Sequence, residues 1–219
     1  VQQFARQEAF YNMGKSLSYQ EVGQLSDQVA SYLQNVLKLP RGERVAIMMP
    51  NILQYPIAVF GILKAGLVVV NTNPLYTPRE LEHQLNDSGV RGIVLAENFT
   101  RSVAEVRPQV PTLRDIVVTP FKKMLKVGRE RPFTRYEAQP QDMAMLQYTG
   151  GTTGVAKGAV LTHANLLANA TQINLWIGSG NIGAGDVIIT ALPLYHIFSC
   201  TINALGFSSR GVHAVLVTN

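Results

Sequence analysis

Cysteine and charged side chains are both scarce in this sequence. The single cysteine, Cys200, excludes a disulfide within the chain and is typical of a reducing compartment. We expect it to be a small, buried apolar residue. Only 15% of the residues are charged and 47% are hydrophobic, which argues against a disordered segment and favours a globular protein with a core of its own.

A hydrophobic run long enough to cross a bilayer is also missing. The most apolar window, Pro56–Val70, is too short for a transmembrane helix and is interrupted by Lys64. We interpret it as a buried helix followed by a strand. The first ten residues, VQQFARQEAF, have no apolar centre, so we expect no signal peptide there and a soluble, cytoplasmic protein.

The charge pattern restricts the partners. A formal net charge of +5 suits a protein that handles small anions, and equally one that touches an acidic membrane surface. No nucleic-acid motif and no interleaving of basic and aromatic residues is present, so we expect no nucleic-acid partner. Histidines and acids show no metal-ligand spacing: His163 is expected near a helix start, and His83 and His213 have no recognisable partner.

Strand and helix patterns alternate along most of the chain. Apolar runs predict strands at 44–49, 67–71, 92–96, 115–119, 144–148, 187–192 and 212–218. Helical periodicity and capping signals predict helices at 18–37, 52–65, 78–87, 99–106, 162–176 and 197–207. This alternation predicts an α/β fold with two helix-covered, largely parallel sheets.

The alternation breaks in one segment. Phe121–Arg135 has six basic residues, one acid and no apolar periodicity, so we interpret 121–141 as a solvated linker. We therefore expect a first α/β subdomain at 1–120 and the start of a second at 142–219. Asn71, Asn73, Pro74 and Tyr76 follow the end of a strand, where α/β proteins place functional loops, although a turn that fixes the next helix is the better explanation.

The most informative stretch is Gln147–Ala159, QYTGGTTGVAKGA. Glycines and threonines alternate in it and a lysine follows: Thr149, Gly150, Gly151, Thr152, Thr153, Gly154 and Lys157. Glycines allow successive N–H groups to point into one concavity, hydroxyls add donors and lysine adds a positive charge, which together suit a phosphate. Because Gly158 follows Lys157, this is not a Walker A sequence. A mobile surface loop is the alternative that composition alone leaves open.

This order resembles the phosphate loop of the adenylate-forming, AMP-binding enzymes, whose pattern is roughly [ST]-[ST]-G-[ST]-T-G-x-P-K-G. Gly150 departs from the opening run, and Ala156 replaces the usual proline, which removes a fixed φ angle. The stretches Arg44–Asn51, Gln54–Gly89 and Ala191–Phe198 extend the resemblance to bacterial long-chain fatty-acid–CoA ligases. The family usually has longer segments within 121–141 and between Phe4 and Glu8.

The resemblance implies distorted Rossmann-like subdomains and a two-step reaction that converts a fatty acid, ATP and CoA to acyl-CoA, AMP and pyrophosphate, with Mg²⁺. It places the loop residues on the phosphates of ATP. It also places Tyr195 and His196 beside the acyl-adenylate pocket, although a lone histidine next to an apolar helix is more often a satisfied core or surface group. We do not expect His196 to act as a general base, because a carboxylate needs no deprotonation at neutral pH.

Several motifs of the family are absent from these 219 residues. They are the Tyr-Gly-x-Thr-Glu motif, the ribose-binding aspartate and the C-terminal catalytic lysine, so we predict no catalytic residue here and an N-terminal part that is inactive alone. An aryl- or short-chain-acid ligase, or a non-catalytic nucleotide- or acyl-binding module of the same fold, remains an alternative. A homodimer and peripheral contact with the inner membrane are further candidates for its interactions.

Overall fold

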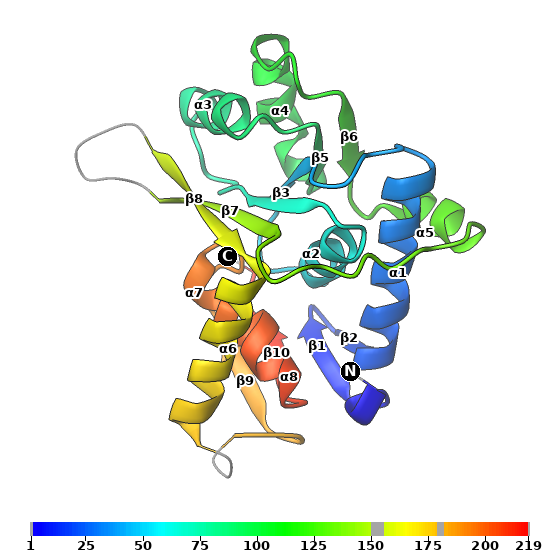
Figure 1. The fold of residues 1–219 in the computed structure, drawn as a ribbon, viewed down its shortest axis with the longest axis vertical. Helices are drawn as coiled ribbons and strands as arrows, with labels where there is room; N and C mark the ends of the chain where they lie inside the picture. The colour runs from blue at the N-terminus through cyan, green and yellow to red at the C-terminus, as the bar shows by residue number, and fades with distance from the viewer. Residues whose placement is uncertain (1, 150–155, 179–181, 219) are drawn as a thin grey trace.

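The larger of two sheets forms the centre of the molecule (Figure 1). The computed structural model describes residues 2–149, 156–178 and 182–218. The sheet has the order β6-β5-β3-β4-β7-β8, and only β7 and β8 pair antiparallel. Its strands are β3 (Arg44–Met48), β4 (Val68–Asn71), β5 (Gly92–Leu95), β6 (Asp115–Val118), β7 (Met143–Thr149) and β8 (Lys157–Thr162).

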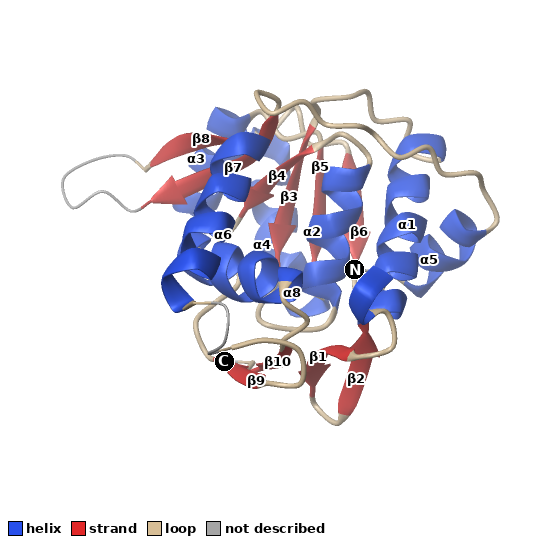
Figure 2. Ribbon diagram, turned by 60° about the horizontal axis from the view of Figure 1, so that its bottom comes forward, coloured by secondary structure: helices blue, strands red, loops and turns tan. Residues whose placement is uncertain are grey.

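Helices cover both faces of this sheet, as Figure 2 shows. Alternate strand residues supply two cores, because successive side chains of a strand point to opposite faces. Val45 and Ile47 join the core under α1 and α2, whereas Ala46 and Met48 join the core under α3 and α4. The helices are α1 (Tyr19–Asn35), α2 (Gln54–Lys64), α3 (Pro78–Ser88) and α4 (Thr100–Val106).

The smaller sheet brings the first and last parts of the chain together. Its order is β2-β1-β10-β9, with β1 parallel to β10 and β10 parallel to β9. Its strands are β1 (Glu8–Asn12), β2 (Lys15–Ser18), β9 (Val187–Thr190) and β10 (His213–Leu216). The Asn12 amide donates to the Leu216 carbonyl at 3.0 Å, which fixes the two segments against each other. The predicted fold class, α/β with two helix-covered and mostly parallel sheets, is confirmed.

Local capping signals are formed as the sequence predicts. The Ser18 hydroxyl accepts from the Glu21 N–H and the Glu21 carboxylate accepts from the Ser18 N–H, which begins α1. Thr77 and Glu80 make the same reciprocal pair at the start of α3. These hydrogen bonds lower the pKa of both glutamates, because they favour the charged carboxylate.

The segment predicted as a solvated linker is partly a packed helix. Helix α5 (Lys122–Arg129) lies against α1, and Phe121 and Met124 are buried. The sequence shows no helical periodicity of apolar residues here because only a few side chains of this eight-residue helix face α1. Those few contacts are enough to hold the helix in place. Each sheet also contains strands that precede and strands that follow 121–141 in the sequence. In the larger sheet, β7 and β8 come from the part after this segment, and in the smaller sheet, β1 and β2 come from the part before it.

The region after the glycine loop also differs from the prediction. The sequence indicated a loop leading directly to a helix, but β8 pairs with β7 before α6 (His163–Ile177) begins. The predicted helix at 197–207 is divided into α7 (Ile197–Ser199), a π-helix (Cys200–Gly206) and α8 (Phe207–Ser209). His163 is the first residue of α6, as expected.

Exposed apolar side chains gather in the second half of the chain. Leu167, Leu175 and Trp176 are exposed on α6, and Val187 and Ile189 are exposed on β9. Apolar patches of this kind mark contact surfaces. Among the described residues, none of the helices combines the length and apolar character needed to cross a bilayer.

The close contact between α5 and α1 gives a stability prediction. A Cβ added at Gly128 would overlap the Gln28 carbonyl oxygen, so Gly128→Ala must move α5 away from α1. We expect the free energy of unfolding to fall by about 1–3 kcal/mol, the usual cost of overpacking. Chemical denaturation of the full-length protein measures it. Gly183→Ala is the control because a Cβ there meets nothing within 4 Å, and equal effects of the two changes would contradict the packing.

Candidate functional site

The glycine loop connects the two antiparallel strands β7 and β8. Thr149 ends β7, Lys157 begins β8, and the two residues face each other across the ladder. Both side chains are exposed, so they are accessible to a ligand. The predicted phosphate contacts Gly150, Gly151, Thr152, Thr153 and Gly154 lie outside the described residues, and their role stays a prediction.

Tyr148 ties the base of this hairpin to α3. Its hydroxyl donates to the Asp87 carboxylate, and its pKa is raised by burial and by this contact with a negative group. The ring packs on Gly158, where an added Cβ would lie 2.8 Å from the ring. Gly158 is therefore required by the close approach of the Tyr148 ring, as well as being part of the motif.

A buried amide pair lies one residue deeper in the sheet. The Asn71 amide, at the end of β4, donates to Gln147 Oε1 on β7 at 3.0 Å. Gln147 Nε2 donates in turn to the Tyr195 carbonyl at 3.2 Å. The Tyr55 hydroxyl lies between the Asn71 side-chain oxygen, at 2.7 Å, and the Leu194 carbonyl, at 2.6 Å. This network holds the segment 194–195 against the strand that leads into the loop.

The network is almost fully buried, and burial keeps its groups neutral. Asn71 and Gln147 are 3% and 6% exposed, and Tyr55 is fully buried. Burial raises the pKa of Tyr55 well above its usual value and that of the Cys200 thiol to about 11. Cys200 is thus a buried neutral thiol, as the sequence predicted.

Tyr195 and His196 lie at the same edge of the sheet as the loop ends. Tyr195 is half-buried and its pKa is raised by burial. The pKa of Tyr76 is raised first by burial and then by the negative charges of Glu80 and of the Tyr195 phenolate form. His196 is exposed, and its Nδ1 accepts from the Phe198 N–H at 3.3 Å as the N-cap of α7. The predicted role of the pair beside an acyl-adenylate stays a prediction.

Sequence reasoning missed or undervalued other residues. We favoured a turn as the role of Asn71, yet its side chain also joins β4 to β7. His83 has a partner after all, since its Nε2 lies 2.8 Å from the Ala156 carbonyl. His213 lies 3.4 Å from the Glu8 carboxylate. These contacts link residues far apart in the sequence, so spacing could not reveal them.

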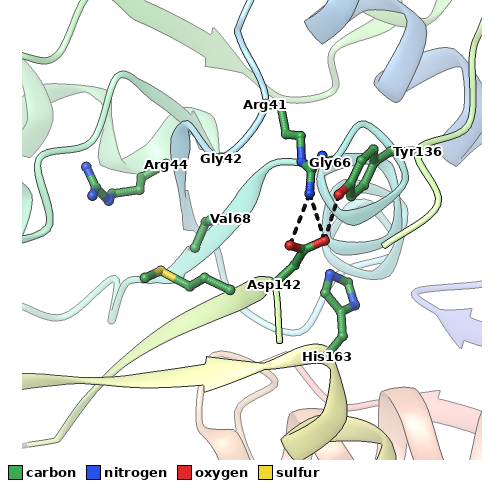
Figure 3. A pocket seen from close by; sticks show the side chains of 9 residues that line it. Arg41, Gly42, Arg44, Gly66, Val68, Tyr136, Asp142 and His163 are labelled. Carbon is green, nitrogen blue, oxygen red and sulfur yellow. Dashed lines mark hydrogen bonds and ion pairs between the residues drawn. The ribbon is translucent and has the colours of Figure 1, made fainter. Parts of the chain in front are cut away.

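A small pocket of about 110 Å³ opens at the opposite edge, where β3, β4 and β7 begin (Figure 3). Arg41 makes two 3.1 Å contacts with the Asp142 carboxylate, and the Tyr136 hydroxyl donates to it at 2.6 Å. The Arg41 guanidinium also stacks on Tyr136, 4.1 Å from the ring centre. These contacts fasten the segment before β7 to the sheet. Asp142 is satisfied by them, and the pocket is separate from the candidate site.

The described residues do not form a cluster of metal-binding side chains. Within residues 2–149, 156–178 and 182–218, His, Cys, Asp and Glu side chains do not gather in any group of three that could hold a metal ion. The arrangement at the loop edge instead offers one cation, exposed hydroxyl and aromatic groups, and a neutral buried support. That chemistry suits an anionic ligand with an organic part.

The buried amide pair gives a second prediction. Asn71→Leu or Gln147→Met removes one partner and leaves the other buried without it, which should reduce the free energy of unfolding by about 1–3 kcal/mol. The double variant removes both polar groups and should lose less than the sum of the two single losses. A double-mutant cycle by chemical denaturation measures the coupling, and strictly additive losses would contradict it.

Many known proteins are similar to this chain in sequence and in fold. The family described as AMP-binding enzyme matches residues 1–219. A long-chain-fatty-acid–CoA ligase of Escherichia coli O6:H1 is 44% identical, and the match covers 100% of this chain and 45% of that protein. A ligase of the same name from Bacillus subtilis is 32% identical over 88% of this chain and 40% of its own length. The chain therefore spans less than half the length of these relatives.

The matched region is longer in the relative than in this chain. It extends over 252 residues of the Escherichia coli protein against 219 here, so the relative has additional residues inside the aligned region.

Solved structures show the same fold. A long-chain-fatty-acid-CoA ligase from Archaeoglobus fulgidus superimposes with a TM-score of 0.88 at 24% identity, over 98% of this chain and 44% of that one. The N-terminal domain of FACL13 from Mycobacterium tuberculosis gives a TM-score of 0.88 at 23% identity, over 100% of this chain and 55% of that domain. The family match, the whole-chain identity and the hairpin with its lysine agree: the chain belongs to the AMP-binding enzyme family.

Proposed function

We propose that the full-length protein is an ATP-dependent long-chain fatty acyl-CoA synthetase and that this chain supplies its phosphate loop. The observation that carries the proposal is the 44% identity to such ligases in a match that covers the whole chain. The chain also contains the glycine, threonine and lysine motif from Thr149 to Lys157. The paired loop ends and the Tyr195–His196 segment lie at one edge of the sheet, as a site for ATP and an acyl group requires.

The reaction has two displacements, the first at the α-phosphorus of ATP and the second at the acyl carbon. A carboxylate oxygen of the fatty acid bonds to the α-phosphorus of ATP, and the bond to the pyrophosphate oxygen breaks. The thiolate sulfur of CoA then bonds to the acyl carbon, and AMP leaves. Negative charge builds on phosphoryl oxygens in the first step, so fixed donors around those oxygens provide most of the acceleration.

The residues of this chain act by holding phosphates. Lys157 supplies a positive charge, and Thr149 with the loop threonines supplies hydroxyl donors for the β- and γ-phosphates. The buried pair of Asn71 and Gln147 keeps β7 and the Tyr195 segment at a constant separation. Mg²⁺ usually binds one or two carboxylates and substrate phosphates. No group of three His, Cys, Asp or Glu side chains gathers within the described residues, and we assign Mg²⁺ no ligand here.

The decisive experiment is ATP–pyrophosphate exchange by the full-length protein, screened over acids from acetate to oleate. Exchange that requires a long-chain acid supports the proposal. Exchange with only aryl or short-chain acids would identify another ligase of the family. No exchange with any acid, together with nucleotide binding, would identify a non-catalytic module.

The same assay tests the lysine. Lys157→Ala should slow adenylate formation about ten- to a hundredfold, the value of one charge-assisted contact to phosphate. Thioester formation from preformed acyl-adenylate should change much less, because pyrophosphate has already left. Equal losses in both half-reactions with a lower melting temperature would show that the loop is only scaffold.

A cytoplasmic location with peripheral contact to the inner membrane is a second part of the proposal. Phe121–Arg135 contains six of the 19 basic and one of the 14 acidic residues, which leaves thirteen of each sign in the rest of the chain. The whole excess charge thus lies within 121–135, the segment that contains α5. Lys122, Lys123 and Lys126 of this helix are exposed while Met124 packs inward. Such a surface suits anionic lipid headgroups.

Sedimentation with phosphatidylglycerol vesicles tests this surface. Each lysine near a charged bilayer is worth about 1 kcal/mol, so the triple change Lys122→Glu, Lys123→Glu and Lys126→Glu should weaken binding at least about tenfold. The control reverses the exposed Arg101, Arg107 and Arg114 to glutamate, which alters the net charge equally. Equal weakening by both triples would show that net charge alone matters, and no binding by the unaltered protein would remove the membrane contact.

A further inference from the structure

Helix α3 holds the glycine loop from both sides. Asp87 accepts from Tyr148, two residues before the first loop glycine, and His83 contacts the Ala156 carbonyl, immediately before Lys157. Residues four apart lie on the same side of a helix, so one face of α3 reaches the entry and the exit of the loop. In the sequence, Thr149–Gly154 lies between these two attachments, and Lys157 directly follows the second.

The contact at Ala156 stands where the family pattern has proline. Proline would restrict the backbone before the lysine through its ring, and alanine does not. Here the carbonyl of that residue is fixed by a 2.8 Å contact with His83 Nε2 instead. Because a carbonyl only accepts, Nε2 must have the proton, which holds for one neutral tautomer and for the charged imidazole.

Helix α3 is itself firmly attached to the sheet. Its first turn is closed by the capping box of Thr77 and Glu80, and Leu81 and Leu85 are fully buried. Gln84, next to His83, donates to the Asn71 backbone carbonyl at 2.8 Å. Helix α3, which carries His83, is therefore fixed to β4 through Gln84. The contact of His83 with the Ala156 carbonyl in turn fixes the end of the loop relative to α3.

We propose that His83 is a positioning residue for the phosphate loop: its hydrogen bond to the Ala156 carbonyl replaces the missing proline and sets where Lys157 begins β8. The inference rests on the proposed function for its kinetic consequence. His83 acts through the backbone and does not itself contact ATP. Its loss would leave Lys157 present but less well placed.

Kinetics of ATP–pyrophosphate exchange by the full-length protein test the role. His83→Ala should raise KM for ATP about three- to tenfold, the effect of one neutral hydrogen bond, with kcat nearly unchanged. His83→Gln keeps an N–H donor at a similar reach and should stay close to the unaltered protein. Glu82→Ala, a neighbouring change on the same helix, is the matched control.

A second change separates positioning from general damage. Ala156→Pro restores the backbone restriction by another means, so in the His83→Ala background it should recover most of the lost ATP affinity. A structural defect in α3 would not be repaired there. Failure of Ala156→Pro to rescue, or a KM for ATP that does not move in His83→Ala, would overturn the proposal.

Limited trypsin digestion gives a measurement without catalysis. Lys157 is exposed, and its peptide bond becomes cleavable when the loop exit opens locally. His83→Ala should accelerate cleavage after Lys157 several-fold relative to cleavage after Lys126 in the same sample, and Ala156→Pro should reverse this. If the unaltered protein shows no exchange activity, the proposed function fails, whereas unchanged cleavage after Lys157 means that the His83 anchor fails.

Discussion

The hydrogen bond between the buried amides of Asn71 and Gln147 is the constraint on which the site depends. It joins β4 to β7, strands that are adjacent in the sheet although the two residues are 76 positions apart in the sequence. Gln147 then reaches the Tyr195 carbonyl, so three separate segments meet at one amide. Since both amides are buried, each depends on the other for one of its hydrogen bonds, and the strands cannot shift register without leaving polar groups unpaired.

The elements predicted correctly from the sequence are those with local signals. Capping boxes at Ser18 and Thr77 and short apolar runs for the parallel strands lie within a few residues of the elements that they predict. Strands β1 and β2 were missed because β1 pairs with β10, about two hundred residues away, as the 3.0 Å bond from Asn12 to Leu216 shows. Helix α5 was missed because half of its residues are basic and exposed, so the few side chains that face α1 do not form a recognisable helical pattern in the sequence.

The same division applies to the site. Thr149 and Lys157 belong to a contiguous motif, and the structure places them opposite each other at the ends of a hairpin. The residues that hold this hairpin come from other elements: Asp87 and His83 from α3 and Asn71 from β4. Spacing could not predict them, because a contact between distant segments depends on the packing of the whole sheet. The strand β8 was also unexpected, since a glycine-rich start and an exposed apolar residue such as Val160 do not resemble a buried strand.

The distribution of charge around the loop explains how one edge of the sheet can be both rigid and able to bind an anion. Inside the sheet the supports are an amide pair and a phenol, which stay neutral and so avoid the cost of burying an ion. At the surface, the side chain of Lys157 is exposed and accessible to a ligand. The carboxylate of Asp87 is the exception, but it is exposed and its contact is with the Tyr148 hydroxyl, which it holds in the protonated form. Because Thr149 and Lys157 are fixed opposite each other at the ends of β7 and β8, an anion between them would order few further groups of these two strands, so more of the contact energy would remain for binding.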